Sequence, residues 1–393
     1  MKLIPHELLP EALKRIDSIK KYMRETGMEA LLVSSNTNIY YTTLRFFRGY
    51  VYIPVDNEPI WFVVKPETFE KEDYFEYIRK PEQIPEILKQ RGYKESQNIG
   101  LELDTAPYSE IMRLSAVFSG AQLLNASIPL RKSRMVKTPW EIKKMEEDAI
   151  HQCEAYRHIK HCYKPGITDL KFQIEIEHVL RLEGCLGVIR TAGNLMEINL
   201  GSVIAGDNAD EPGPYDFTMG GEGVDPSNPV GANGRTIKNG ETVMIDMNGS
   251  FNGYQTDMTR VWRLGEIPEL AYKAHQCSRN ILREMEKMGV PGCPVSKLYE
   301  RAMEIVAQEG LNDYFMGHRA KVSFIGHGVG IELNEPPVIM QKSRDVLEKN
   351  MTIAIEPKFV IPKVGAVGVE NSYVVTDLGL RNLTVFPEEI EEL

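Results

Sequence analysis

The sequence lacks a long uninterrupted apolar run, so it offers no segment that could span a bilayer as a helix. Its first residues, MKLIPHELLPEALKRID, are broken by prolines and charges and do not have the pattern of a secretory signal peptide. Basic residues are also in deficit: 46 Lys and Arg stand against 56 Asp and Glu, a formal net charge of -10. This balance argues against a dedicated nucleic-acid binder. We therefore expect a cytoplasmic protein that binds neither membrane nor nucleic acid.

Cysteine is scarce as well. The five cysteines are odd in number, scattered, and form no CxxC pair. This usage favours reduced thiols over a disulfide framework or a thiolate metal site. The cysteines are Cys153, Cys162, Cys185, Cys277 and Cys293.

Residues 201–240 are rich in Gly, Pro, Asp and Asn but contain no GK[ST] motif. The segment does not pass from a strand straight into a helix, so a phosphate-binding loop is disfavoured. We expect a long ordered loop instead. Long loops in compact domains are often functional, so this one is predicted to line a site.

A chain of 393 residues is long enough for two domains. Residues 1–133 are predicted to form an α/β domain, with a helix over 10–27 that ends at Gly27. Runs typical of strands follow it. They are EALLVSS, GYVYIPV, PIWFVV, NIGLEL and AQLLNAS.

Residues 134–393 are predicted to form a second domain of the α+β class. Thr138, followed by Pro139 and Glu141, has the pattern of a capping box at the start of a helix. Further helices are predicted to begin near Thr168 and near Pro294. The stretches between and after them are β-rich with hairpin turns, which indicates helices grouped against a largely antiparallel sheet.

The segment TVMIDMNGSFNGYQTDMTRVW, residues 242–262, predicts a β-hairpin. Asn-Gly at 252–253 between two alternating runs is a strong turn signal. Counting outward from that turn places Asp246 opposite Thr259. Asp246 and Asp257 then lie on one face of adjacent strands. Two such carboxylates repel each other unless one is protonated or a cation lies between them.

Three further candidates lie downstream in β-rich contexts. His327 is in GHGVG, Glu356 ends the run MTIAIE, and Glu370 is in VGVENSYVVT. Charged residues in such strands are seldom fully buried unless they are paired. With Asp246 and Asp257 they make four carboxylates and one imidazole, which suggests a binuclear site for Mn, Fe, Co or Zn.

The order Asp, Asp, His, Glu, Glu, with spacings of 11, 29 and 14 residues within the pairs Asp246–Asp257, His327–Glu356 and Glu356–Glu370, resembles the M24-type pita-bread metallopeptidases. That family includes prolidase, aminopeptidase P and creatinase. The similarity covers 134–393, and 1–133 resembles the creatinase/prolidase N-terminal domain. The resemblance implies a pita-bread catalytic domain and a homodimer, in which residues 38–49 would cap the partner's pocket.

The resemblance also implies roles for the five ligands. Asp246 would bind one metal, His327 and Glu356 the other, and Asp257 and Glu370 would bridge. A water held between two divalent ions becomes a nucleophile near neutral pH. Glu356 would accept its proton.

The chain departs from prolidase-like peptidases at two substrate-site histidines, which are replaced by Val230 and Asn334. Asn334 can donate a hydrogen bond but cannot carry a proton at neutral pH. His318, nine residues before His327, is a candidate replacement. We therefore predict Glu356, Asn334 and His318 as catalytic residues. Arg190, Glu197, Asp207, Asp210 and Tyr215 are further candidates for binding a charged substrate.

Three functions remain in competition. The first is a binuclear metallohydrolase in which a metal-bridged hydroxide attacks the carbonyl of an Xaa-Pro amide bond in a small peptide. The second is a metal-dependent enzyme of the same fold with another reaction, such as a lyase acting on dimethylsulfoniopropionate, because Val230 and Asn334 replace the histidines. The third is a non-catalytic scaffold, which the retention of all five ligands disfavours, since buried carboxylates without a cation are costly.

Overall fold

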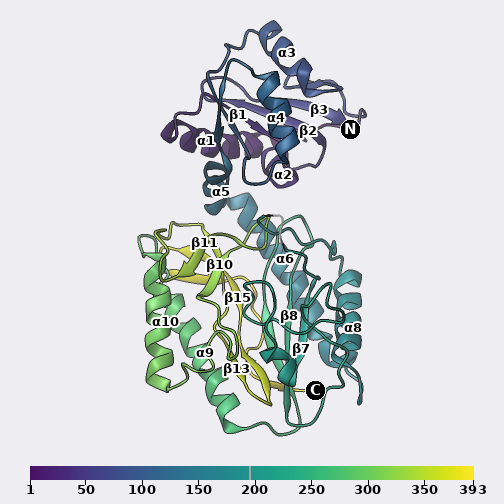
Figure 1. The fold of residues 1–393 in the computed structure, drawn as a ribbon, viewed down its shortest axis with the longest axis vertical. Coiled ribbons are helices and arrows are strands. Elements are labelled where there is room, and N and C mark those ends of the chain that lie inside the picture. Colours follow the sequence, from purple (N-terminus) through teal and green to yellow (C-terminus); the bar gives the residue numbers. More distant parts are fainter. Residues whose placement is uncertain (194–195) are drawn as a thin grey trace. The chain divides into compact units, whose positions relative to one another are not determined.

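The computed structural model describes residues 1–193 and 196–393. The chain divides into two compact units, Met1–Arg134 and Met135–Leu393 (Figure 1). Within the described residues, no helix has both the length and the apolar content that crossing a membrane requires. Each of the five cysteines is a free thiol.

The first unit is built on a mixed six-stranded sheet in the order β4-β3-β2-β1-β5-β6. Its strands are β1 (Ala30–Val33), β2 (Arg48–Pro54), β3 (Ile60–Lys65), β4 (Phe75–Tyr77), β5 (Asn98–Leu101) and β6 (Gln122–Asn125). Its helices are α1 (Leu9–Glu25), α2 (Asn36–Thr43), η1 (Pro81–Gln83), α3 (Ile84–Gln90), α4 (Tyr108–Val117) and α5 (Ser127–Met135). All five predicted strands are present. Gly27 has a positive φ of 70° just beyond α1, as a helix terminus of this kind requires.

The helices of the second unit begin where the sequence predicts at three places. Thr138 caps α6 (Pro139–Arg157) and forms the expected capping box with Glu141. Thr168 caps α8 (Asp169–Leu182), and Pro294 precedes α10 (Val295–Glu309). The sequence analysis did not identify α7 (Ile159–Cys162) or the 20-residue α9 (Glu269–Met288).

The strands of this unit form three sheets, ordered β17-β9-β8-β7, β11-β10-β12-β15-β16 and β13-β14. The first has β7 (Gly201–Ala205), β8 (Glu241–Met247), β9 (Thr259–Leu264) and β17 (Glu391–Glu392). The others have β10 (Phe324–Gly328), β11 (Glu335–Met340), β12 (Thr352–Ile355), β13 (Lys358–Ile361), β14 (Gly365–Gly368), β15 (Asn371–Thr376) and β16 (Gly379–Asn382).

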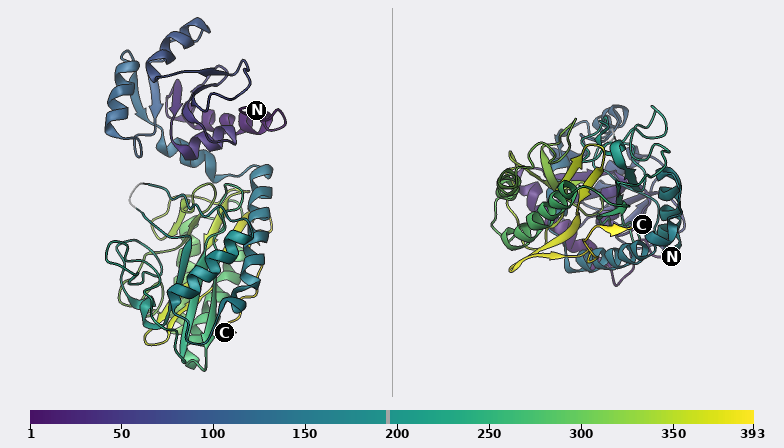
Figure 2. Two further views of the ribbon diagram at one scale, coloured as in Figure 1. Left: turned by 90° about the vertical axis from the view of Figure 1, so that its right-hand side faces the viewer. Right: turned by 90° about the horizontal axis from the view of Figure 1, so that it is seen from below.

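Two pairs of helices cover these sheets on opposite sides (Figures 1 and 2). One core lies between α6, α8 and the sheet of β7, β8 and β9, and includes Phe172, Val243 and Trp262. The other lies between α9, α10 and the remaining strands, and includes Ile281 and Phe359. The strands that carry the predicted site residues therefore lie in the middle of the unit, with a pair of helices packed on each side.

Two expectations about the strands have different outcomes. The hairpin register is confirmed, because Asp246 pairs with Thr259 and the bridge between Gly249 and Thr256 keeps the same count. The expectation of a loop beginning at residue 201 is wrong at its start. Residues 201–205 form β7, which pairs with β8, and the short helix η2 (Gly206–Asp210) follows before the irregular part begins.

Candidate metal centre

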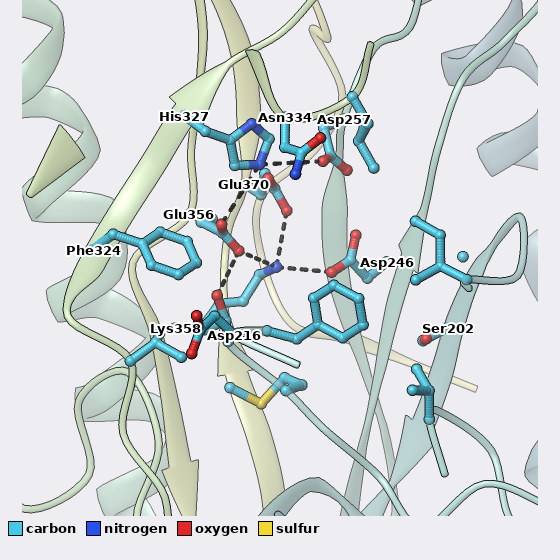
Figure 3. A pocket seen from close by; sticks show the side chains of 18 of the residues that line it. Ser202, Asp216, Asp246, Asp257, Phe324, His327, Asn334, Glu356, Lys358 and Glu370 are labelled. Atoms are coloured by element: carbon cyan, nitrogen blue, oxygen red, sulfur yellow. Dashed lines mark hydrogen bonds and ion pairs between the residues drawn. The ribbon is translucent and has the colours of Figure 1, made fainter. Parts of the chain in front are cut away.

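A cavity of about 540 Å³ opens among the central strands of the second unit. The four predicted carboxylates and His327 lie in its wall (Figure 3). Most of the remaining wall is apolar. It includes Met196, Ile198, Phe217, Met219, Val230, Phe324, Leu333, Val338 and Met340. The irregular part of the 201–240 segment contributes Asp216 to Met219 and Val230, so this segment lines the cavity.

The glycines beside His327 allow the neighbouring strands to approach its backbone. A Cβ atom on Gly326 would lie 2.2 Å from the carbonyl oxygen of Ala354 in β12. A Cβ atom on Gly328 would lie 2.1 Å from the carbonyl oxygen of Pro336 in β11. Both distances are far below van der Waals contact, so the glycines are needed for close strand packing around His327.

The ring of His327 is oriented by its own strand. Its Nδ1 lies 3.1 Å from the carbonyl oxygen of Gly328, which can only accept, so Nδ1 carries the hydrogen. In a neutral ring, Nε2 is then the nitrogen with the lone pair. It lies 3.8 Å from an oxygen of Asp257 and 3.8 Å from an oxygen of Glu356. A metal-binding histidine is typically oriented in this way.

Asp257, His327 and Glu370 can hold a metal ion. Each offers one ligand atom, and these atoms lie within 4.8 Å of one another. Oδ1 of Asp257 and Oε1 of Glu370 are buried and have no hydrogen-bond partner within the described ranges. Buried carboxylate oxygens without a partner are costly, so a cation fits here. Two oxygen ligands and one nitrogen suit Mn, Fe, Co or Zn.

Asp246 and Glu356, the other two predicted ligands, contact a different cation, as does the second oxygen of Glu370. The ammonium nitrogen of Lys358 lies 2.8 Å from Oδ2 of Asp246, 2.8 Å from Oε2 of Glu356 and 2.9 Å from Oε2 of Glu370 (Figure 3). The Lys358 side chain is only 1% exposed. Lys358 was not among the predicted site residues. The available signal was its spacing, because Lys358 is two residues after Glu356 and residues two apart in an extended chain share a face.

Burial and mutual repulsion shift the pKa values of these groups. Burial, followed by the charges of Glu370 and Asp246, holds the pKa of Asp257 well above its usual value. Burial raises the pKa of Glu370 to about 8. For Glu356, burial is outweighed by the Lys358 ammonium and His327, so its pKa lies below the usual value. Burial is likewise outweighed for Lys358, whose pKa is raised by Asp246, Glu356 and Glu370. Without a bound ion, Glu356 is therefore better compensated than Asp257 or Glu370.

Asn334 and Val230, which replace the two expected histidines, both line the cavity. The amide oxygen of Asn334 accepts a hydrogen bond of 2.7 Å from the backbone N–H of Ala192. Its amide nitrogen lies 3.9 Å from the sulfur of Met196. Asn334 therefore binds the backbone of Ala192 through its amide oxygen and directs its amide nitrogen to Met196.

His318 lies outside the wall of this cavity. Its Nδ1 is 2.9 Å from Oδ2 of Asp210, and its ring stacks on Tyr314. The structure does not bring His318 to the carboxylates, so the placement gives no support for its predicted catalytic role. Four other residues were predicted to bind a charged substrate, and none of them is among the described residues that line the cavity. They are Arg190, Glu197, Asp207 and Tyr215.

The sequence matches two family models. Metallopeptidase family M24 matches residues 143–377, and the creatinase/prolidase N-terminal domain matches residues 15–136. The chain belongs to metallopeptidase family M24. The expected resemblance, the pita-bread fold and the enzyme class, a metallohydrolase, are thereby confirmed.

Relatives of this M24 chain match it over nearly its whole length. An uncharacterized peptidase of Bacillus subtilis, YqhT, is 26% identical over 390 residues, which cover 96% of this chain and 99% of that protein. The Xaa-Pro dipeptidase of Pyrococcus furiosus is 26% identical over 383 residues, with coverage of 96% and 99%.

Two solved structures have the same fold. The Xaa-Pro dipeptidase from Bacillus anthracis has a TM-score of 0.80 at 22% identity and covers 97% of this chain and 100% of its own. The prolidase from Pyrococcus horikoshii has a TM-score of 0.77 at 22% identity, with coverage of 96% and 99%. Family membership makes this chain a metal-dependent peptidase by class, and Lys358 is the feature of its site that the expected ligand set does not include.

Proposed function

We propose that this M24 chain hydrolyses an amide bond in a small, largely apolar peptide, with an Xaa-Pro bond as the first candidate. The observation that carries the proposal is the group Asp257, His327 and Glu370, which has two buried oxygens without partners in the wall of a mainly apolar cavity. These three residues would hold a divalent cation. Three of the four relatives and solved structures named above are Xaa-Pro dipeptidases or prolidases, which supports the same substrate class.

A divalent ion bound there would polarise a carbonyl group and lower the pKa of a water molecule. The chain itself supplies the proton acceptor. Oε2 of Glu356 accepts hydrogen bonds from Thr218, at 2.7 Å, and from Lys358. Its other oxygen, Oε1, faces Nε2 of His327. Because the Glu356 pKa lies below its usual value, Oε1 is ionised at neutral pH and can accept a proton from water.

The apolar wall favours a substrate with hydrophobic side chains, since a proline ring or an aliphatic residue would displace water from Phe217, Met219 and Phe324. Asn334 is the polar group that replaces an expected histidine. Its amide N–H is free to donate to a substrate carbonyl if the weak contact with Met196 is given up. No titratable ring is required for that contact.

The test is release of free proline or free amino acid from a panel of Xaa-Pro dipeptides and tripeptides, followed by mass spectrometry. The metal-free chain would be loaded separately with Mn, Co, Fe and Zn. We expect metal-dependent turnover that is lost in Asp257→Ala. A matched control is Asp216→Ala, because Asp216 is an acid in the same cavity outside the proposed ligand group.

Absence of turnover with every metal, while the ion still binds, would contradict the peptidase proposal. It would favour the alternative, a metal-dependent enzyme of another reaction type, and small carboxylate substrates would then be screened. The homodimer expected from family resemblance also stays a prediction, and light scattering would test it against the 44.6 kDa of one chain.

A further inference from the structure

We propose that the Lys358 ammonium occupies one of the two cation positions of the carboxylate cluster, so that the chain binds a single divalent ion at Asp257, His327 and Glu370. The inference rests on the proposed function and deepens it, because it fixes the number of ions with which that function must work. It concerns Lys358 itself, which no expected ligand set includes.

The geometry directs Lys358 into the cluster. Glu356 and Lys358 flank Pro357 in the short connection between β12 and β13. The hydrogen bond from Lys358 Nζ to Glu356 Oε2 shows that both side chains enter the same cluster. Lys358 begins β13 and pairs with Gly368 of β14, which fixes its backbone on the cavity wall. A Cβ atom on Gly368 would lie 2.9 Å from the Lys358 Cα, so the two strands are in close contact there.

The ammonium group is fully used in this position. It has three N–H donors, and three carboxylate oxygens lie at 2.8 Å, 2.8 Å and 2.9 Å, one each from Asp246, Glu356 and Glu370. Charge-assisted bonds of this length are strong when they are buried. A divalent ion that used the same three oxygens would have to lie where the ammonium lies. The two cations exclude each other by volume and by repulsion.

The two halves of the cluster are therefore unequal. On the Asp246 side, every facing oxygen has a hydrogen from Lys358. On the His327 side, Oδ1 of Asp257 and Oε1 of Glu370 are buried without partners in the described parts of the chain. The two oxygens of Glu370 differ in the same way. Its Oε2 accepts a hydrogen bond from Lys358, whereas its Oε1 has no hydrogen-bond partner among the described residues. The position that still needs a cation is the one beside His327.

The experiment counts ions. Metal-free protein would be titrated with Mn²⁺, and bound metal would be measured by mass spectrometry and by electron paramagnetic resonance. We expect about one ion per wild-type chain, with the spectrum of an isolated Mn²⁺ ion. In Lys358→Met, which removes the ammonium and keeps an unbranched side chain one atom shorter, we expect about two ions per chain and the spectrum of a coupled pair.

Lys321→Met is the matched control, because Lys321 also lines the cavity and its ammonium binds the carbonyl of Asn312 instead of a carboxylate. It should keep the wild-type count. Two ions in the wild type, or no gain in a folded Lys358→Met, would overturn the proposal. If Lys358→Met fails to fold without metal, the wild-type count and spectrum decide the question alone. The count needs no turnover, so an inactive chain with one ion would contradict only the proposed hydrolysis.

Discussion

Asp246 and Asp257 come from one hairpin but have different electrostatic surroundings. Asp246 is 30% exposed and binds the Lys358 ammonium. Asp257 is buried, has an unpartnered Oδ1, and repels Glu370 and Asp246. The buried Asp257 carboxyl group therefore lowers the stability of the metal-free protein, and its proposed function is to bind the metal ion.

This difference predicts opposite effects of two matched substitutions on the metal-free protein. Asp257→Asn removes a buried carboxyl group that must either hold its proton or carry a charge without a compensating partner, so the free energy of unfolding should rise by about 1–3 kcal/mol. Asp246→Asn removes a carboxylate partner of the buried Lys358 ammonium, so the free energy of unfolding should fall by about 1 kcal/mol or more. Urea unfolding at neutral pH with a chelator present measures both. If both variants changed the free energy of unfolding in the same direction, the proposed difference between the surroundings of Asp246 and Asp257 would be contradicted.

The predicted metal ligands could be identified from the sequence at this scale, but the contacts of Lys358 with three of them could not. The two Asp, the His and the two Glu were found from residue type and spacing, and the structure brings them to one cavity. Lys358 is separated from Asp246 by 112 positions in the sequence. The alternation rule gives the face on which its side chain lies, but only the tertiary fold determines which carboxylates that face meets.

At the scale of elements, the hairpin of β8 and β9 shows what local chemistry fixes. The Asn252-Gly253 turn was enough to predict that Asp246 pairs with Thr259. The way in which the turn is held was not predictable, because it depends on α6. Asp148 of that helix accepts hydrogen bonds from the backbone N–H of Phe251, at 2.5 Å, and from the Thr256 hydroxyl, at 3.1 Å.

Asp148 predicts a pH dependence of stability. Burial raises its pKa to about 7 from 3.8. Below about pH 4 the folded and unfolded chains both hold the proton. Between about pH 4 and pH 7 the unfolded chain loses it while the folded chain keeps it, so stability falls as pH rises. Asp148→Asn keeps Oδ1 as an acceptor and does not titrate, so it removes this loss.

We therefore expect the unfolding free energy of the wild type, relative to that of Asp148→Asn, to decrease by a few kcal/mol across that window, on the order of 1.4 kcal/mol per pKa unit. Thermal or urea melts of both proteins at several pH values measure it. The difference between the unfolding free energies of the two proteins at each pH cancels the contribution from titration of the metal ligands. A difference that does not change with pH would show that Asp148 is ionised throughout and that its hydrogen bonds outweigh its burial.

At the scale of the whole molecule, each unit has buried hydrophobic clusters made from its own residues. A cluster with Tyr52, Phe62 and Leu114 lies within Met1–Arg134. Two clusters described above, those with Phe172 and with Ile281, lie within Met135–Leu393. The sequence predicted two domains from length and from the change of strand pattern. Helix α9 was not predicted, because no side-chain cap marks its start after Pro268. Its buried residues Ala274, Ile281 and Met285 do recur at helical spacing, and this was the available signal.

The two clusters within Met135–Leu393 predict that this fragment folds alone and binds its ion. Every proposed ligand and Lys358 belong to it, as do the strands that position them. A cooperative thermal transition, a native-like circular dichroism spectrum and about one Mn²⁺ per fragment are expected. The same fragment with Asp257→Ala is the control, since it should fold and bind no ion. A fragment that folds but binds no Mn²⁺ would mean that the cation position depends on residues of the first unit. A fragment that does not fold would mean that its cores are insufficient without residues 1–134.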